Sequence, residues 1–209
     1  MTLFDLPPQR PMPGVVHLPG WLPPRRQVEL AEQCRRWGDA DPGLSRVRMP
    51  SGHFMSVRQV CLGWHWTPYR YRRTTPDGRP VPPMPAWLVA LARDCLADAY
   101  GDVGDYTPDV ALINHYTADA RMGMHQDKDE RSPAPVVSLS LGDTAVFRIG
   151  GTTDRTRPRW QTHLASGDAL VFGGPARHAY HGVPKILPGT APPPLPTGRW
   201  NITIRQAGL

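Results

Sequence analysis

The chain has 209 residues, 40% of them apolar, and a formal net charge of +6. That length suits one globular domain, and no apolar run approaches the roughly 18 residues that a membrane-spanning helix needs. Three scattered cysteines argue against a disulfide framework or a thiolate metal cluster, and the first residues lack a basic, apolar leader, so we expect a cytoplasmic protein with reduced thiols.

The basic residues are strongly biased toward arginine, because only Lys128 and Lys185 are lysines. Arginine forks match phosphates and base edges, so the bias is compatible with a polyanionic partner. A GC-rich genome explains the arginines and the 26 prolines equally well. Charge alone therefore does not assign a nucleic-acid function.

The first half of the chain predicts two helices. The proline-rich residues up to Pro24 read as an extended arm, and Pro23-Pro24 suits the first turn of a helix that ends at Gly38. Residues 39–85 are rich in glycine, proline, arginine and aromatics, which indicates short strands and loops at the surface. From Met84 the apolar residues follow helical spacing, and Gly101 ends this second helix.

After Gly101 the pattern changes to short strands separated by glycine, proline or aspartate turns. We expect strands at 110–116, 136–141, 145–149, 159–164, 169–172, 178–183 and 199–205. Several short strands at this spacing indicate a sandwich or jelly roll, and helices that precede strands indicate packing on one face of it.

The sequence at 125–130, His-Gln-Asp-Lys-Asp-Glu, contains a candidate metal site. On a strand, His125 and Asp127 would point to the same face. Two histidines and one carboxylate on one face of a metal are typical of non-haem iron(II) oxygenases. The spacing leaves the third ligand open among the remaining histidines: His163, His178 and His181 downstream, and His17, His53, His65 and His115 upstream.

The last predicted strand separates two kinds of side chain. Trp200, Ile202 and Ile204 share an apolar face, whereas Arg199, Asn201, Thr203 and Arg205 share the other. The two arginine Cα atoms are about 20 Å apart on an extended strand. They are too far apart to bind one carboxylate side by side, but their long side chains can approach opposite ends of a short dicarboxylate.

These motifs together resemble the AlkB family of nucleic-acid dealkylases, with the bacterial members most similar. The resemblance runs in order from about Met55 to Gly208, roughly three quarters of the chain. It comprises Leu-Ile-Asn-His-Tyr at 112–116, the segment 125–130, Val-Ser-Leu-Ser-Leu-Gly at 137–142, Tyr-His-Gly at 180–182, and the segment 199–208. It implies an α+β fold: a double-stranded β-helix (jelly roll) at about 105–209 with helices packed on one face, preceded by a nucleotide-recognition lid at about 39–85 within a single domain.

The resemblance also assigns residues and cofactors. Iron(II) is expected on His125, Asp127 and His181, with dioxygen and the co-substrate 2-oxoglutarate. The expected 2-oxoglutarate contacts are Asn114, Tyr116, Arg199, Asn201 and Arg205, with Arg199 at the distal carboxylate and Arg205 nearer the iron. The expected substrate contacts are Met55, Ser56, Trp64, Tyr69, Tyr71, Asp129 and Arg155, with Trp64 stacking on the base and the catalytic Asp129 orienting it. Trp66 is either a further lid contact or packing beneath the lid.

The implied activity is oxidative demethylation of 1-methyladenine and 3-methylcytosine in DNA, preferably single-stranded, with release of formaldehyde and succinate. A base inside a duplex must be flipped to reach the metal. The same chemistry on RNA or transfer RNA is the nearest alternative. A small-molecule hydroxylase should lack the aromatic lid, and a binding module without turnover has no need of the ligand set. We expect a monomer.

Overall fold

The computed structural model describes residues 6–157 and 159–209. Two helices, α1 (Pro24–Asp39) and α2 (Ala86–Tyr100), lie on one side of the molecule, and both confirm the sequence prediction. Gly101 ends α2 with a φ of 80°, a left-handed conformation that glycine adopts without steric cost. Within the described ranges, no helix is long and apolar enough to cross a membrane.

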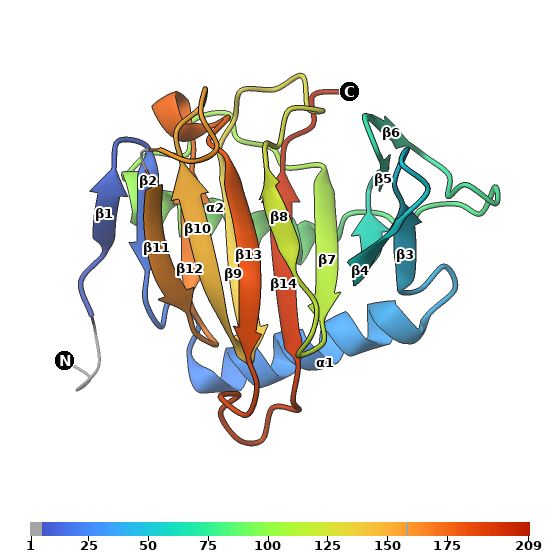
Figure 1. Ribbon diagram of the computed structural model, residues 1–209, viewed down its shortest axis with the longest axis horizontal. Helices are drawn as coiled ribbons and strands as arrows, with labels where there is room; N and C mark the ends of the chain where they lie inside the picture. The colour runs from blue at the N-terminus through green and yellow to red at the C-terminus, as the bar shows by residue number, and fades with distance from the viewer. Residues whose placement is uncertain (1–5, 158) are drawn as a thin grey trace.

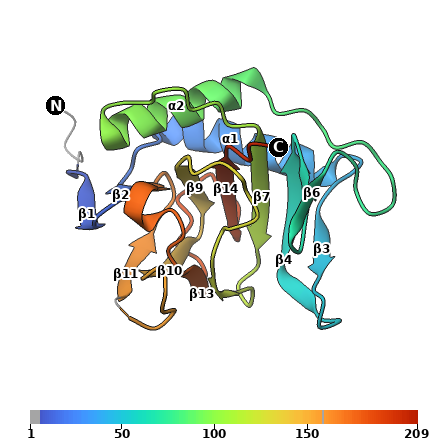
Figure 2. The same cartoon turned by 90° about the horizontal axis from the view of Figure 1, so that it is seen from above.

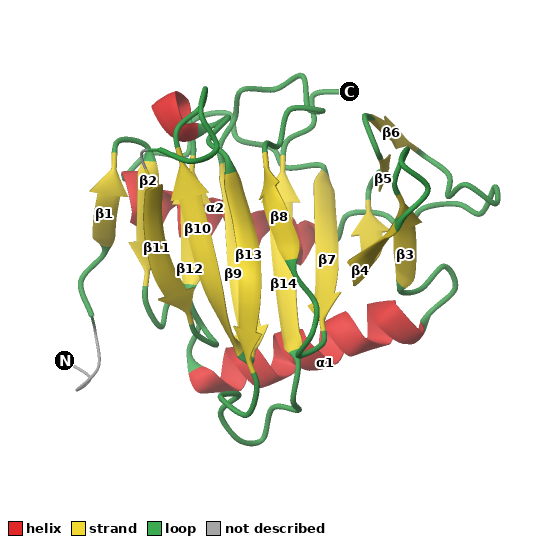
Figure 3. Ribbon diagram, in the orientation of Figure 1, coloured by secondary structure: helices red, strands yellow, loops and turns green. Residues whose placement is uncertain are grey.

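The strands form an eight-stranded sheet, a four-stranded sheet and a two-stranded hairpin (Figures 1 and 3). The large sheet has the order β1 (Gln9–Met12), β2 (Val15–Leu18), β12 (Ala169–Phe172), β9 (Val136–Gly142), β14 (Arg199–Arg205), β7 (Val110–Tyr116), β4 (Phe54–Leu62) and β3 (Ser45–Arg48). The small sheet has the order β11 (Arg159–Leu164), β10 (Thr144–Gly150), β13 (His181–Leu187) and β8 (Met122–His125). The hairpin pairs β5 (His65–Thr67) with β6 (Arg70–Arg72), and a short 3₁₀ helix, Gly174–Ala176, precedes β13.

The chain crosses repeatedly between the two sheets, which makes a jelly roll. From β7 to β14 the successive strands belong to the large, small, large, small, small, large, small and large sheet, with antiparallel pairing throughout. This alternation is that of a double-stranded β-helix. The architecture is therefore the α+β fold expected from the sequence.

Two apolar layers hold these elements together. Leu30 and Cys34 of α1 and Leu88 of α2 pack against the outer face of the large sheet, where they meet Ile202 and Ile204 of β14. A second cluster, with residues from both sheets, lies between them. Trp200, Ile202 and Ile204 thus share one apolar face, as predicted, and the structure places that face on the helix side. The polar face of β14 is turned toward the small sheet. All three cysteines are buried and unpaired in disulfides.

Three expectations about the elements are wrong in detail. The N-terminal arm is not merely laid on the domain, because β2 is fully buried and pairs with β12. Part of residues 39–85 joins the core, because β4 is nine residues long and pairs with β7. The strand predicted at 178–183 begins at His181 instead, since the 3₁₀ helix and the turn after it occupy the preceding residues.

Candidate active site

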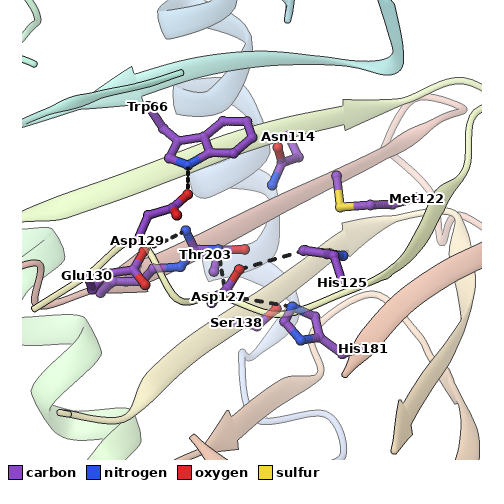
Figure 4. A network of polar contacts seen from close by, with 12 residues as sticks. Trp66, Asn114, Met122, His125, Asp127, Asp129, Glu130, Ser138, His181 and Thr203 are labelled. Carbon is purple, nitrogen blue, oxygen red and sulfur yellow. Dashed lines mark hydrogen bonds and ion pairs between the residues drawn. The ribbon is translucent and has the colours of Figure 1, made fainter. Parts of the chain in front are cut away.

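The three expected metal ligands converge between the two sheets. His125 ends β8 and is the direct register partner of His181, which begins β13, so the two imidazole rings stand side by side with centroids 4.4 Å apart. Gly182 permits this approach, because a Cβ there would lie 2.8 Å from the backbone oxygen of Met122. Asp127 is in the loop after β8, and its carboxylate oxygens lie 3.7 Å and 3.6 Å from the Nε2 atoms of His125 and His181 (Figure 4).

Hydrogen bonds orient the histidine rings for metal binding. Nδ1 of His125 lies 2.9 Å from the Gly123 carbonyl oxygen, and Nδ1 of His181 lies 3.0 Å from that of Ala179. A proton on each Nδ1 satisfies these carbonyls and leaves each Nε2 with a lone pair that faces the carboxylate. Burial and the neighbouring His125 lower the pKa of His181 to about 4, so this ring is neutral near pH 7, as metal binding requires.

Asp127 is buried and ionised. Burial alone would raise its pKa, but the nearby Arg205, His181 and His125 hold the pKa of this carboxyl well below its ordinary value. Its Oδ2 atom lies 2.7 Å from Nη2 of Arg205, yet no hydrogen-bond donor in the described chain is aligned with it. The atom therefore keeps acceptor capacity, and one carboxylate with two imidazoles is the donor set that fits iron(II).

His125 and Asp127 do not share a strand face, contrary to the prediction, since β8 ends at His125 and the loop turns Asp127 toward the two rings. His178 is exposed, with its Nδ1 3.3 Å from the backbone oxygen of Asp127, and it lies outside the ligand cluster. His163 is an exposed residue of β11. The structure thus brings together the set that the family resemblance implies.

The polar face of β14 forms the floor of a cavity of about 500 Å³ beside these ligands. Arg199 is 1% exposed and donates from Nη2 to Ser140 Oγ at 3.0 Å, whereas its Nε and Nη1 atoms have no hydrogen-bond partner in the described chain. Asn201 lies opposite Asn114 in the sheet, and their side chains are joined by a 3.2 Å hydrogen bond. A buried guanidinium with open donors is costly unless an anion completes it, so this end of the cavity fits a carboxylate.

Arg205, at the other end of β14, contacts the metal site directly through Asp127. Its Nη1 atom also lies 3.0 Å from Tyr71 Oη and 3.2 Å from Glu130 Oε1. Burial alone would lower the pKa of Arg205, but Asp127, Tyr71 and Glu130 raise it, so the guanidinium stays charged. The two arginines are thus at opposite ends of one cavity.

Two residues to which the sequence assigned no role complete this network. Glu130 is buried and accepts hydrogen bonds from Arg205, from the Tyr71 hydroxyl and from Nη2 of Arg177, the last at 3.1 Å. Arg177 also donates to the backbone oxygen of Asp127 at 2.7 Å. Glu130 belongs to the recognised segment 125–130, which could have drawn attention to it, whereas Arg177 carries no local sequence signal.

The outer part of the cavity contains some of the expected substrate residues. Met55, Tyr69, Asp129 and Arg155 line it together with Trp66, and Tyr69 is 71% exposed. The indole nitrogen of Trp66 donates to Asp129 Oδ2 at 2.8 Å, which fixes an aromatic ring and a carboxylate side by side (Figure 4).

Three other expected substrate residues are not among those that line the cavity. Trp64 packs against the small apolar cluster that contains Cys61 and Leu112, with the Arg73 guanidinium 3.6 Å from its ring centroid. Tyr71 points into the Glu130 network, and the Ser56 hydroxyl donates to the backbone oxygen of Arg121. The tryptophan at the cavity is therefore Trp66, two residues after the one expected. Trp64 lies in the bend that connects β4 to β5, whereas Trp66 lies within β5.

Comparisons with known proteins identify the enzyme class to which the chain belongs. Residues 14–205 match the model of the 2OG-Fe(II) oxygenase superfamily. An alpha-ketoglutarate-dependent dioxygenase AlkB homolog of Caulobacter vibrioides is 43% identical over 205 residues, which cover 94% of this chain and 89% of the relative. The DNA N(6)-methyladenine demethylase ALKBH1D of Arabidopsis thaliana is 32% identical over 93% of this chain, which spans 49% of that relative's length.

Among solved structures, that of OsALKBH1 superimposes with a TM-score of 0.84 and 36% sequence identity, and the match covers 95% of this chain and 100% of the other. The chain belongs to the AlkB family of iron(II)- and 2-oxoglutarate-dependent dioxygenases. Its metal is iron(II), and its co-substrates are 2-oxoglutarate and dioxygen.

Proposed function

We propose that this dioxygenase removes methyl groups from the ring nitrogens of 1-methyladenine and 3-methylcytosine in single-stranded DNA. The observation that carries the proposal is the pairing of Trp66 with Asp129 at 2.8 Å in the wall of the cavity that contains His125, Asp127 and His181. A flat aromatic ring and a carboxylate are the two groups that a flat, cationic base requires.

The physical argument rests on the charge of the lesion. A methyl group on N1 of adenine or N3 of cytosine makes the base a cation, which an aromatic face attracts. The Asp129 carboxylate neutralises that charge and accepts a hydrogen bond from the exocyclic amine, so the methyl group is oriented toward the metal. A base in a duplex cannot reach this cavity unless it is flipped, which favours single strands. Residues 39–85, which carry Met55, Trp66 and Tyr69, then serve as the nucleotide-recognition lid.

The inner part of the cavity is assigned to the co-substrate. Arg199 receives the distal carboxylate of 2-oxoglutarate and Arg205 is nearer the metal, while Asn114, Tyr116 and Asn201 complete the polar wall. When bound, iron(II) with 2-oxoglutarate and dioxygen supplies the oxidation of a methyl C–H bond, with succinate and carbon dioxide as co-products. The hydroxylated methyl group then leaves the base nitrogen as formaldehyde.

Demethylation of N6-methyladenine is a second candidate, supported by the likeness to the Arabidopsis relative of that name. That base is neutral, and its methyl group is on the exocyclic amine itself. A carboxylate beside the amine therefore favours the cationic lesions over N6-methyladenine.

Mass spectrometry of methylated oligonucleotides tests both candidates. Single-stranded DNA that carries one 1-methyladenine is incubated with the protein, iron(II), ascorbate and 2-oxoglutarate in air, in parallel with an N6-methyladenine oligonucleotide and a methylated RNA. We expect loss of one methylene mass from 1-methyladenine first, dependent on 2-oxoglutarate and abolished by Asp127→Ala. Faster turnover of N6-methyladenine or of RNA, or succinate formation without any mass change, would refute the preferred substrate.

A further inference from the structure

A second cavity, of about 510 Å³, lies in the region of residues 39–85, outside the catalytic cavity. Its walls come from the turn that joins β3 to β4 and from the β5–β6 hairpin, which stand together at one end of the molecule (Figure 1). It is lined by Arg48, Met49, Pro50, Gly52, Thr67, Pro68, Arg70, Arg72 and Pro76. Among these residues the charges are all positive, so the cavity, here called the arginine groove, selects for anions.

The three arginines of the groove are exposed, and their charges are not balanced by carboxylates of the described chain. Within residues 6–157 and 159–209, none of Arg48, Arg70 and Arg72 is in an ion pair with a carboxylate. Two neighbouring arginines, Arg73 and Arg79, do have partners. Arg73 donates to the Gly63 carbonyl oxygen and covers the Trp64 ring, and Arg79 pairs with Asp41 and Asp77. Three like charges held together without counter-charges favour an external polyanion.

The arginine groove adjoins the catalytic cavity. Met49 lines both, and the two-residue turn of the β5–β6 hairpin separates them, with Pro68 on the groove side and Tyr69 on the catalytic side. Tyr69 has a φ of 72°, the one positive value at a residue other than glycine in the described chain. A bulky residue in this conformation is strained by about 1–3 kcal/mol. The turn accepts this strain and thereby presents an exposed aromatic ring at the junction of the two cavities.

We propose that the arginine groove binds the phosphodiester backbone of the substrate strand beside the nucleotide that enters the catalytic cavity. This proposal rests on the proposed function, because it takes the substrate to be a single nucleic-acid strand. The strand then passes over Tyr69, on which a neighbouring base can stack, and places about three phosphates against Arg48, Arg70 and Arg72. A basic groove beside an exposed aromatic ring is the usual combination for single-strand binding.

The test is the salt dependence of binding to an unmodified single-stranded oligonucleotide of about 15 nucleotides. The full chain is loaded with Mn(II) and 2-oxoglutarate, so that no turnover occurs, and affinity is measured by fluorescence anisotropy between 50 and 200 mM salt. For single strands, the slope of log K against log salt is about 0.7 per neutralised phosphate. The triple variant Arg48→Gln, Arg70→Gln, Arg72→Gln is therefore expected to lower the slope by about 2 and to weaken binding about tenfold or more at 50 mM salt.

The matched control removes the same charge from another face. Arg25, Arg35 and Arg36 are exposed on α1, on the far side of the large sheet from the small one (Figure 2). Their triple substitution to glutamine is expected to change the slope little. Substitution of the three groove arginines by lysine should keep most of the wild-type slope, because phosphate contacts need only charge. Thermal unfolding checks that each variant is folded.

Three outcomes would overturn the groove proposal: an unchanged slope in the groove variant, an equal loss in the α1 variant, or equally tight, arginine-dependent binding of an acidic polypeptide of the same charge. The binding assay needs neither a lesion nor turnover, so it can refute the groove proposal separately from the proposed function. A slope change without any demethylation would refute the function and keep the groove. Demethylation without a slope change would refute the groove and keep the proposed function.

Discussion

At the scale of single residues, the site depends on which of two nearby tryptophans faces the cavity. Trp64 is in the segment that resembles the family, but it does not line the cavity, and the Arg73 guanidinium covers its ring. Trp66 lines the cavity and is fixed by Asp129. Stacking on a base is worth about 1–3 kcal/mol. The two tryptophans should therefore have separable roles, with Trp66 in binding and Trp64 in the stability of the lid.

We predict that Trp66→Ala lowers kcat/KM for a methylated oligonucleotide by about 5- to 150-fold, which is the stacking energy expressed as a rate ratio. Trp64→Ala should lower kcat/KM much less but reduce the thermal midpoint, because it removes buried apolar contacts and a cation–π pair. Steady-state kinetics and calorimetry on both variants separate the two effects. A larger kinetic loss in Trp64→Ala, with an unchanged midpoint, would reverse the assignment.

At the scale of elements, the sequence pattern predicted the features that depend on regular helix and strand geometry. Proline and glycine at its ends located the first helix, and the spacing of apolar residues located the second. The alternation along β14 separated Ile202 and Ile204 from Arg199 and Arg205. Residues in loops escaped this reasoning. Arg177 follows a 3₁₀ helix and reaches Glu130 across 47 positions of sequence, a contact that only the folded chain creates.

The loop after β8 is held by buried charges rather than by a sheet. Glu130 joins Arg177, Arg205 and Tyr71, so it connects β6, β14 and the loop that carries Asp127. Arg177 fixes the backbone of Asp127, and Arg205 fixes its carboxylate. Removing one member of a buried ion-pair network leaves the others uncompensated, at a cost of about 3–5 kcal/mol.

We predict that Glu130→Gln destabilises the protein by about 3–5 kcal/mol and weakens metal binding, because Arg177 and Arg205 lose a counter-charge and Asp127 loses its orientation. Urea unfolding and Mn(II) titration measure the two effects. Glu29→Gln, which removes two exposed arginine pairs on α1, is the control and should leave both unchanged. Normal Mn(II) affinity in Glu130→Gln would mean that the network has no role in positioning Asp127.

At the scale of the whole molecule, the cofactor site lies across the two sheets. His125 and His181 belong to the small sheet, whereas Arg199 and Arg205 belong to the large one. A 2-oxoglutarate molecule that meets both the metal and Arg199 therefore connects the sheets. Without it, Arg199 is a buried charge with two nitrogens that have no hydrogen-bond partner among the described residues, which opposes folding. Stability should thus depend on the co-substrate, and Arg199 should carry that dependence.

We predict that Arg199→Met raises the thermal midpoint of the protein without ligands, because an apolar side chain of similar length replaces a buried, incompletely paired charge. With Mn(II) present, 2-oxoglutarate at 100 times its Kd should stabilise the unsubstituted protein by about 2.7 kcal/mol, a gain that Arg199→Met should lose. Differential scanning calorimetry with and without 2-oxoglutarate measures both terms, and Arg159→Met, at an exposed position of β11, serves as the control. If Arg199→Met keeps the full 2-oxoglutarate shift, the distal carboxylate binds elsewhere in the cavity. If Arg199→Met lowers the ligand-free midpoint, the contacts of Arg199 with Ser140 and the Tyr116 ring outweigh the cost of burying its charge.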